Sequence, residues 1–279
     1  MKDITGITLE QKAEIASYIR EDTLEEVNRN IVRAVPRVSF YTKYVKRFLD
    51  LLVGIIGFVI SSPINLIIAI VTFFDVGSPI LFKQTRIGKD KKPFTIYKFR
   101  NMTNETDANG VLLPPSQRVT KWGSFVRKTS LDELLNFVSV IKGDMSIIGP
   151  RPLINTYVDR LHDRHQAIYA VRPGLECPSL HKVDHLLSWQ ERLDNYVWYV
   201  ENCSFTVDAK LCLRIVALAF DRKSTKVRSS ANHGGIMGYD KEGNIIYTKS
   251  VPDKYVEPFL DHHGYQSLQE AIDARNEAK

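Results

Sequence analysis

The chain has 279 residues, of which 44% are hydrophobic and 25% are charged, and its formal net charge is +6. These proportions are close to globular averages, so they exclude wholesale disorder and a membrane protein with many spans. The length accommodates one sizeable domain with appendages or two small domains. Three cysteines, an odd number without paired metal-ligand spacing, argue against a disulfide framework and for a reducing compartment.

Residues 1–40 are polar and are predicted to form an amphipathic helical extension. Its helix is expected to begin near Thr8, because Gln11 three residues later completes the pattern of a capping box. Such an extension serves packing or association, and association between copies of this chain as a homo-oligomer is one option.

Residues 51–74 form an apolar run of 24 residues without a formal charge. As a helix the run would be about 36 Å long, against roughly 30 Å for the hydrocarbon core of a bilayer, so its length permits a crossing. Ser61, Ser62 and Pro63 interrupt it at its midpoint, and proline removes an amide donor from a helix. Each arm of about 18 Å can reach just past the bilayer middle and return.

Both flanks of the apolar run are basic. Lys43, Lys46 and Arg47 precede it, and Lys83, Arg86, Lys89, Lys91 and Lys92 follow it. The positive-inside rule therefore places both ends on the cytoplasmic side. Two interpretations remain: a re-entrant hairpin over residues 41–75, broken at Ser62 and Pro63, or a kinked helix that crosses the bilayer. Binding to nucleic acid is disfavoured, because the basic block brackets a membrane segment and lacks interleaved stacking aromatics.

The remaining pattern predicts an α+β fold that is mainly helical, with short strands and interfacial amphipathic helices. Strands are expected over residues 79–83 and 94–99, and helices over 130–141, 154–171, 188–200 and 207–220, with a late hairpin around Glu242-Gly243-Asn244. We expect a helical extension over 1–40, a membrane hairpin over 41–75, a compact domain over 76–222 and a polar extension over 223–279.

The sharpest local feature is the sequence Ser130-Leu131-Asp132-Glu133. One interpretation is a capping box, with Ser130 as the cap and both acids in the first helical turn. The other interpretation is chemical, because amides at a helix terminus stabilise an ionised carboxylate, which can bind magnesium or attack phosphorus. The two interpretations are compatible.

Arg151 lies between two prolines in the run 143–152. Its guanidinium is therefore expected on a rigid loop suited to bidentate phosphate binding, although a simple turn accounts for the same residues. Lys98 and Arg100 lie before the acid pair, and more cations follow in residues 121–128. A diphosphate with bound magnesium needs such an arrangement of charges.

Several segments in this order carry a resemblance to a known family: KRFLD (46–50), the Ser-Pro step (62–63), FKQTRIG (82–88), YKFR (97–100), RKTSLDEL (127–134) and GDMSIIGPRP (143–152). Together they closely resemble the bacterial sugar transferases, also called monotopic phosphoglycosyl transferases, over roughly residues 44–220. The resemblance implies a re-entrant helix broken at Ser62 and Pro63. It also implies an enzyme of the bacterial cytoplasmic (inner) membrane that initiates lipid-linked surface polysaccharide or glycoconjugate synthesis, with the catalytic domain, residues 76–222, on the cytoplasmic face.

The same resemblance implies a two-step reaction that depends on Mg²⁺. Asp132 would attack the sugar-bearing phosphate of a UDP-sugar, expel UMP and carry the phosphosugar until polyprenyl phosphate, typically undecaprenyl phosphate, collects it. Asp132 is also the candidate metal ligand, and Glu133 would support the metal or the acceptor phosphate. Arg151 would hold phosphate oxygens. Further candidates for neutralising this charge are Lys98, Arg100 and Arg127.

Residues 175–184 depart from the family pattern, which usually has a Gly-rich run that contains Ala-Gln-Val and ends in Gly-Arg. This difference keeps a second hypothesis open: a non-catalytic membrane adaptor of a glycan-assembly complex. His181, Asp184 and His185 offer only three metal ligands within five residues and form no closed site. Other histidines are expected on solvated surfaces: His162, His165, His262 and His263.

Overall fold

The computed structural model describes residues 1–279 except 108–109, 111, 181–184, 186, 221–233 and 278–279. It confirms a mainly helical α+β fold. Within the described ranges the strands form three separate two-stranded sheets. His181 and Asp184, and the boundary expected at residues 222–223, lie outside the described residues.

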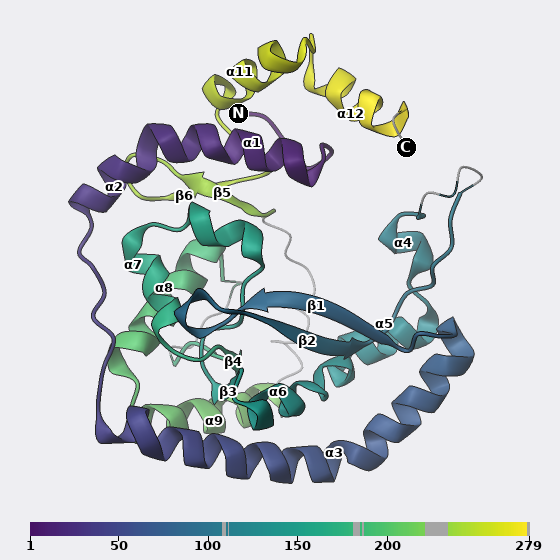
Figure 1. Ribbon diagram of the computed structural model, residues 1–279, viewed down its shortest axis with the longest axis vertical. Helices are drawn as coiled ribbons and strands as arrows, with labels where there is room; N and C mark the ends of the chain where they lie inside the picture. Colours follow the sequence, from purple (N-terminus) through teal and green to yellow (C-terminus); the bar gives the residue numbers. More distant parts are fainter. Residues whose placement is uncertain (108–109, 111, 181–184, 186, 221–233, 278–279) are drawn as a thin grey trace.

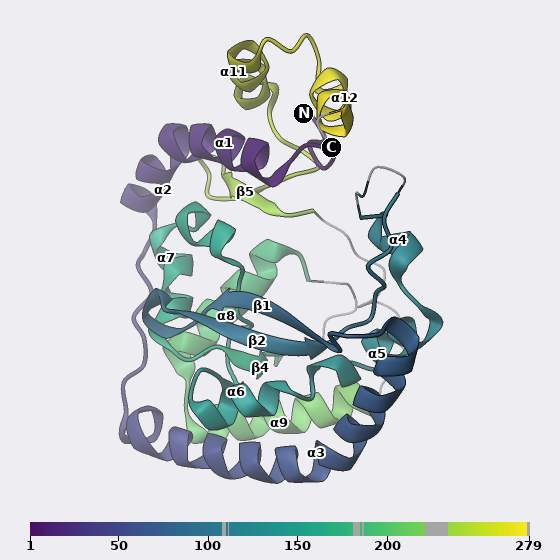
Figure 2. The same cartoon turned by 45° about the vertical axis from the view of Figure 1, so that its right-hand side comes forward.

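The apolar run lies within one long helix, α3 (Lys46–Val76), which continues through Ser61, Ser62 and Pro63. The hydroxyls of Ser61 and Ser62 donate to the carbonyl of Phe58, at 3.2 and 2.7 Å, and such bonds to the preceding turn bend helices. Figures 1 and 2 show α3 curving around one side of the molecule. Among the described helices, residues 41–76 alone are long and apolar enough to cross a membrane, and the hairpin topology stays a prediction.

Both arms of α3 are attached to the same domain. In the first arm, buried Asp50 accepts hydrogen bonds from the hydroxyl of Ser146 at 2.9 Å and from the amide of Ile147 at 3.0 Å. In the second arm, Thr72 accepts a hydrogen bond from the indole of Trp122 at 3.2 Å. The domain therefore lies against the concave side of α3, with contacts near both ends (Figure 2).

The domain beside α3 is built from short strands and helices. β1 (Leu81–Ile87) pairs antiparallel with β2 (Pro93–Phe99), which confirms the first expected strand pair, and β3 (Ser146–Ile148) pairs in parallel with β4 (Gly174–Glu176). Its helices are α4 (Pro115–Arg118), α5 (Lys121–Lys128), α6 (Asn136–Lys142), α7 (Asp163–Gln166), α8 (Trp189–Asn202) and α9 (Phe205–Phe220). Leu193, Tyr196, Val197 and Tyr199 on α8 are buried in the centre of its core.

The two ends of the chain fold together into a second unit, residues 1–30 and 234–277, called the terminal unit below. It contains α1 (Leu9–Ile19), a π-helical turn (Arg20–Leu24), α2 (Glu25–Asn30), β5 (Ile236–Tyr239), β6 (Ile245–Tyr247), α11 (Asp253–His263) and α12 (Leu268–Glu277). Buried side chains from both ends share its core, among them Ile4, Ile15, Ile19, Met237 and Phe259. Figure 1 shows the first and last segments side by side. The sequence analysis had predicted two separate extensions and did not predict this contact.

Local signals identified several element ends. Thr8 and Gln11 form the expected capping box at α1, and Ser188 caps α8 through Glu191. Gly143 ends α6 in the left-handed conformation, with φ of 96°, which favours glycine. The late hairpin is present as the antiparallel pair β5-β6.

Two predicted helices were wrong. Ser130 has a φ of 57° and makes no capping hydrogen bond; a single 3-10 turn (Leu131–Glu133) follows, and α6 begins only at Asn136. Leu131 in this turn and Leu134 after it pack against the end of β2, and the helix does not continue. The segment expected as one helix over 154–171 consists of two 3-10 stretches, Asn155–Arg160 and Ala167–Ala170, with α7 between them.

The expectation that His162 and His165 are solvated was also wrong, because they are 1% and 0% exposed. The two ring nitrogens of His165 bond to the hydroxyl of Tyr239 at 2.6 Å and to a carboxylate oxygen of Asp194 at 2.9 Å. Tyr239 belongs to β5, so the terminal unit covers these histidines. His165 can be buried without a large energetic cost because both of its ring nitrogens have hydrogen-bond partners.

Candidate active site

The acid pair lies on the 3-10 turn between α5 and α6. Asp132 is 6% exposed, whereas the side chain of Glu133 is 25% exposed. The turn is held in place by Leu131 and Leu134, which pack with Phe99 of β2. Packing therefore brings the acid pair to the end of β2, where the YKFR motif lies.

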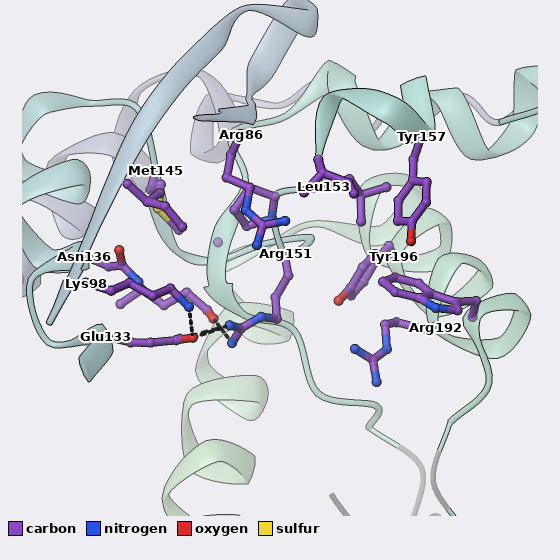
Figure 3. A pocket seen from close by; sticks show the side chains of 16 residues that line it. Arg86, Lys98, Glu133, Asn136, Met145, Arg151, Leu153, Tyr157, Arg192 and Tyr196 are labelled. Atoms are coloured by element: carbon purple, nitrogen blue, oxygen red, sulfur yellow. Dashed lines mark hydrogen bonds and ion pairs between the residues drawn. The ribbon is translucent and has the colours of Figure 1, made fainter. Parts of the chain in front are cut away.

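Two cations bind Glu133 directly (Figure 3). Lys98 on β2 places its Nζ atom 2.7 Å from Oε1, and Nη2 of Arg151 lies 2.8 Å from Oε1 and 2.9 Å from Oε2. Segments separated by 35 and 18 residues thus meet at one carboxylate. The structure brings together three of the residues that the sequence singled out.

Arg151 has further partners that fix its position. Its Nη1 atom donates to the carbonyl of Leu175 at 3.0 Å and to Oε2 of Glu176 at 3.4 Å. Both acceptors lie on β4, which pairs with β3, the strand that precedes the arginine. Burial alone would lower the pKa of Arg151, but the carboxylates of Glu133 and Glu176 raise it overall, so the guanidinium stays charged.

The two neighbouring acids differ in their protonation equilibria. Burial raises the pKa of Asp132, and the nearby charge of Lys98 opposes that rise. For Glu133 burial also acts to raise the pKa, yet the charges and hydrogen bonds of Arg151 and Lys98 hold it below its usual value. Glu133 is thus the stably ionised member of the pair, and Asp132 is the less solvated, more basic carboxylate.

A cavity of about 350 Å³ opens beside Glu133. Its two sides differ in chemistry, as Figure 3 shows: Lys98, Glu133 and Asn136 lie on one side, and Tyr157 and Arg192 lie on the other. The full lining is Arg86, Ile96, Lys98, Glu133, Asn136, Met145, Arg151, Pro152, Leu153, Ile154, Tyr157, Gly174, Leu175, Trp189, Arg192 and Tyr196. Asp132 is buried next to this lining rather than part of it.

Arg86 is a cavity residue that the sequence reading did not single out as a site residue. Its guanidinium donates to Gln84 at 2.8 Å, and within the described part of the chain its Nε atom is buried without a hydrogen-bond partner. Burial, and then the positive charge of Arg151, lower its pKa. Two guanidiniums that repel each other across a cavity indicate a site for an anion. The position of Arg86 within the FKQTRIG segment was the available sequence signal.

Asn136 is a second residue that sequence reasoning missed. Its Oδ1 atom is buried and has no hydrogen-bond partner among the described residues, although the side chain lines the cavity beside Glu133. A carboxylate and an amide oxygen are the ligands that a hard cation such as Mg²⁺ prefers. The unpartnered oxygen of Asn136 therefore fits a magnesium ion, and its position four residues after Asp132 was the sequence signal. The role of Asp132 as a metal ligand stays a prediction.

Another set of metal-ligand atoms lies in the terminal unit. Nδ1 of His262 and Nε2 of His263 bond to the two oxygens of Glu14, at 2.7 and 2.8 Å. The three donor atoms lie within 4.8 Å of one another. Both histidines are exposed, as expected, and their bonds to Glu14 join α11 to α1.

The other predicted site residues lie further from Glu133. Arg100 donates to the carbonyls of Val76 and Pro79, at 2.9 and 2.8 Å, and so holds the C-terminal end of α3. Arg127 is exposed in the last turn of α5, and its charge lowers the pKa of Asp132 slightly against the effect of burial. Their roles in binding phosphate stay predictions.

Comparison with known proteins identifies the family of this chain. A family described as "Bacterial sugar transferase" matches residues 41–222. The chain is 41% identical over 172 residues to the "Uncharacterized sugar transferase EpsL" of Bacillus subtilis, which covers 61% of this chain and 85% of that protein. It is 31% identical over 224 residues to the "UDP-glucose:undecaprenyl-phosphate glucose-1-phosphate transferase" of Escherichia coli, covering 74% and 47%.

A third relative is the "UDP-N-acetylgalactosamine-undecaprenyl-phosphate N-acetylgalactosaminephosphotransferase" of Aeromonas hydrophila. It is 39% identical over 138 residues, 47% of this chain and 32% of that protein. The chain thus spans most of EpsL but less than half the length of the other two relatives. The matched residues include the acid pair, Lys98 and Arg151. The chain belongs to the bacterial sugar transferase family of phosphoglycosyl transferases.

Proposed function

We propose that this chain transfers a sugar 1-phosphate from a UDP-sugar to undecaprenyl phosphate at the cytoplasmic face of the bacterial inner membrane. The observation that carries the proposal is the buried carboxylate of Asp132 beside a Glu133 ion-paired to Lys98 and Arg151, at the edge of a cavity with further arginines. Two of the relatives are named for transfer from a UDP-sugar to undecaprenyl phosphate. Such a reaction would initiate lipid-linked surface polysaccharide or glycoconjugate synthesis.

In the first step Asp132 attacks the phosphorus that bears the sugar. The bond between this phosphorus and the bridging oxygen breaks, UMP leaves with the bonding electrons, and the phosphosugar remains on the carboxylate as an acyl phosphate. In the second step an oxygen of undecaprenyl phosphate attacks the same phosphorus and restores the carboxylate. Burial suits Asp132 to this role, because a poorly solvated carboxylate is a stronger nucleophile and its raised pKa increases its basicity.

The surrounding charges stabilise the phosphoryl group during transfer. Arg151, Lys98 and Arg86 present cations toward the cavity, and Glu133 keeps the first two in a fixed arrangement. Asp132 and Asn136 would hold Mg²⁺, and the charge of the ion would help to neutralise the diphosphate. Arg127 lies where it can add to the positive potential at Asp132.

We infer a re-entrant placement for α3. Its two arms contact one domain, both flanks are basic, and its outer face exposes apolar side chains such as Ile60, Leu66 and Phe74. Phe205 and Leu213 on α9 are also exposed, and Figures 1 and 2 show α9 beside α3. This surface would rest in the cytoplasmic leaflet, where the lipid acceptor is found.

The reaction is tested by UMP release from UDP-sugars in detergent with undecaprenyl phosphate and Mg²⁺. Asp132→Asn should lower UMP release by a factor of about a thousand or more, whereas exposed Asp159→Asn should not change it. Denaturing mass spectrometry of the wild-type chain with donor alone should show one added phosphosugar. UMP release by Asp132→Asn at the wild-type rate would remove Asp132 as the nucleophile, and a wild-type chain inactive with every UDP-sugar would favour the adaptor hypothesis.

The membrane topology needs a separate experiment. In a Cys212→Ser background, single cysteines at Lys43 and Lys89 should both react with a membrane-impermeant maleimide in inside-out vesicles and neither in intact spheroplasts. Labelling of the two positions from opposite sides would establish a crossing helix instead.

A further inference from the structure

One wall of the cavity is aromatic. The rings of Tyr157 and Trp189 meet edge to face, with centroids 5.8 Å apart, and the guanidinium of Arg192 lies 5.2 Å from the centroid of the Trp189 ring. Tyr196, which is 2% exposed, also lines the cavity. This wall lies away from the Lys98–Glu133 ion pair (Figure 3). A ligand that spans the cavity would therefore place an anionic group at one end and a flat, apolar group at the other.

The aromatic wall is held by the terminal unit. The indole N–H of Trp189 donates to the carbonyl of Gly234 at 3.1 Å. A Cβ atom added at Gly235 would lie only 2.9 Å from the hydroxyl of Tyr157, so the backbone there passes close to the end of this side chain. Arg160, on the same 3-10 stretch as Tyr157, donates to the carbonyl of Ile236 at 2.7 Å.

These contacts come from a rigid support. The amide of Gly235 donates to the hydroxyl of Thr248 at 3.0 Å, and the amide of Thr248 donates back to the carbonyl of Gly235 at 2.9 Å. Tyr239, at the end of β5, is fixed from two sides: its carbonyl accepts from Thr23 at 2.7 Å and its hydroxyl bonds to His165. The strand that supports the wall is thus bonded to both the N-terminal segment and the main domain.

We infer that the terminal unit positions Tyr157 and Trp189 as the binding surface for the nucleobase of the donor. The inference rests on the proposed function and adds to it a part of the chain that lies outside the matched residues 41–222. The diphosphate of the donor would extend from this surface toward Arg86 and Arg151. Gly234, Gly235 and Ile236 are positioning residues, because they act on the donor only through the side chains that they hold.

Gly235→Ala is the sharpest test, because the added methyl group meets the Tyr157 hydroxyl and no left-handed backbone angle is involved. The KM for the UDP-sugar should rise on the order of tenfold, with kcat changed less than twofold, because one base-stacking surface is displaced. The Kd of UDP, measured by isothermal titration on the detergent-solubilised full chain, should rise by a similar factor. This second measurement requires no turnover.

A double variant separates positioning from general loosening. In a Tyr157→Phe background the hydroxyl is absent, so Gly235→Ala should cause little further change in KM or in the Kd of UDP. Gly6→Ala is the matched control, since its methyl group meets Ile272 within the terminal unit and not the cavity wall. It should leave both constants at wild-type values while lowering the melting temperature.

The outcomes are distinguishable. If the wild-type chain binds UDP but releases no UMP from any donor, the proposed function fails and the binding measurements still decide the inference. If Gly235→Ala binds UDP as tightly as the wild type, or if Gly6→Ala weakens binding equally, the inference is overturned. Should Gly235→Ala fail to fold, Trp189→Phe keeps an aromatic ring but loses the bond to Gly234, and unchanged UDP affinity in that variant would overturn it as well.

Discussion

Arg151 holds both carboxylate oxygens of Glu133 through one nitrogen, with distances of 2.8 and 2.9 Å from Nη2. The arginine comes from the loop after β3, and the glutamate comes from a 3-10 turn next to the buried Asp132. This contact joins the acid pair and the arginine loop, which the sequence analysis treated as separate candidates. It also predicts how the site responds to substitution.

Arg151→Lys should lower kcat for UMP release roughly a hundredfold, because lysine keeps the charge but cannot contact Glu133 and Leu175 at once. Arg164→Lys is the matched control, since Arg164 also contacts both carboxylate oxygens of a glutamate, Glu201, away from the cavity. Steady-state kinetics of both variants check this prediction. Equal losses in the two variants would mean that the effect comes from folding and not from the site.

Lys98→Met should move the acidic limb of the pH–rate profile toward higher pH. The pKa of Asp132 is raised by burial and lowered by Lys98, so removing the lysine leaves the first effect less opposed. Asp132 must be ionised to attack phosphorus, and a higher pKa makes activity decline at a higher pH. The measurement is kcat/KM for UMP release across pH 5–9. Lys142→Met is the control, because Lys142 lies over the ring of Tyr97 and forms no ion pair with Asp132 or Glu133 among the described residues. A limb at unchanged or lower pH would contradict the electrostatic account.

Asp50→Ala should destabilise the folded chain by about 1–3 kcal/mol, because it leaves the Ile147 amide without its acceptor and the Ser146 hydroxyl with only the Ile148 carbonyl. The same change detaches the first arm of α3 from β3. Thermal unfolding in detergent should show a lower midpoint. An exposed acid such as Asp261→Ala serves as the control and should leave the midpoint unchanged.

His162 makes stability depend on pH. Burial, and then the neighbouring His165, lower the pKa of His162 to about 3 in the folded chain. In the unfolded chain this pKa is about 6.5. Between these two pH values the imidazole is therefore neutral in the folded chain and protonated in the unfolded chain. Stability should therefore fall as pH decreases from about 6.5 toward 3, by about 1.4 kcal/mol per pH unit from this group.

The variant His162→Asn isolates that contribution. In the wild type the His165 amide donates to Nδ1 of His162 at 3.2 Å. Asparagine offers an acceptor for the same amide but does not titrate. Its unfolding free energy should vary less between pH 6.5 and pH 4 than that of the wild type, measured by denaturant unfolding. An identical pH dependence in both proteins would assign the acid sensitivity to other groups.

The sequence by itself determined what local chemistry controls: the apolar run, the starts of α1 and α8, the β1-β2 pair and the motifs around Asp132 and Arg151. Capping residues and alternating or continuous apolar patterns act within a few residues, so they can be read without a fold. The helix expected at Ser130 failed because packing of Leu131 and Leu134 against Phe99 outweighed the local capping pattern.

Only the tertiary structure decided which of the cations reach the acid pair, and that the two ends of the chain form one unit. Lys98 and Arg151 meet Glu133, whereas Arg100 holds the end of α3, although all three lie in motifs of similar charge. Contacts of this kind join segments far apart in the chain. Their free energy comes from burying side chains against partners that no local pattern identifies.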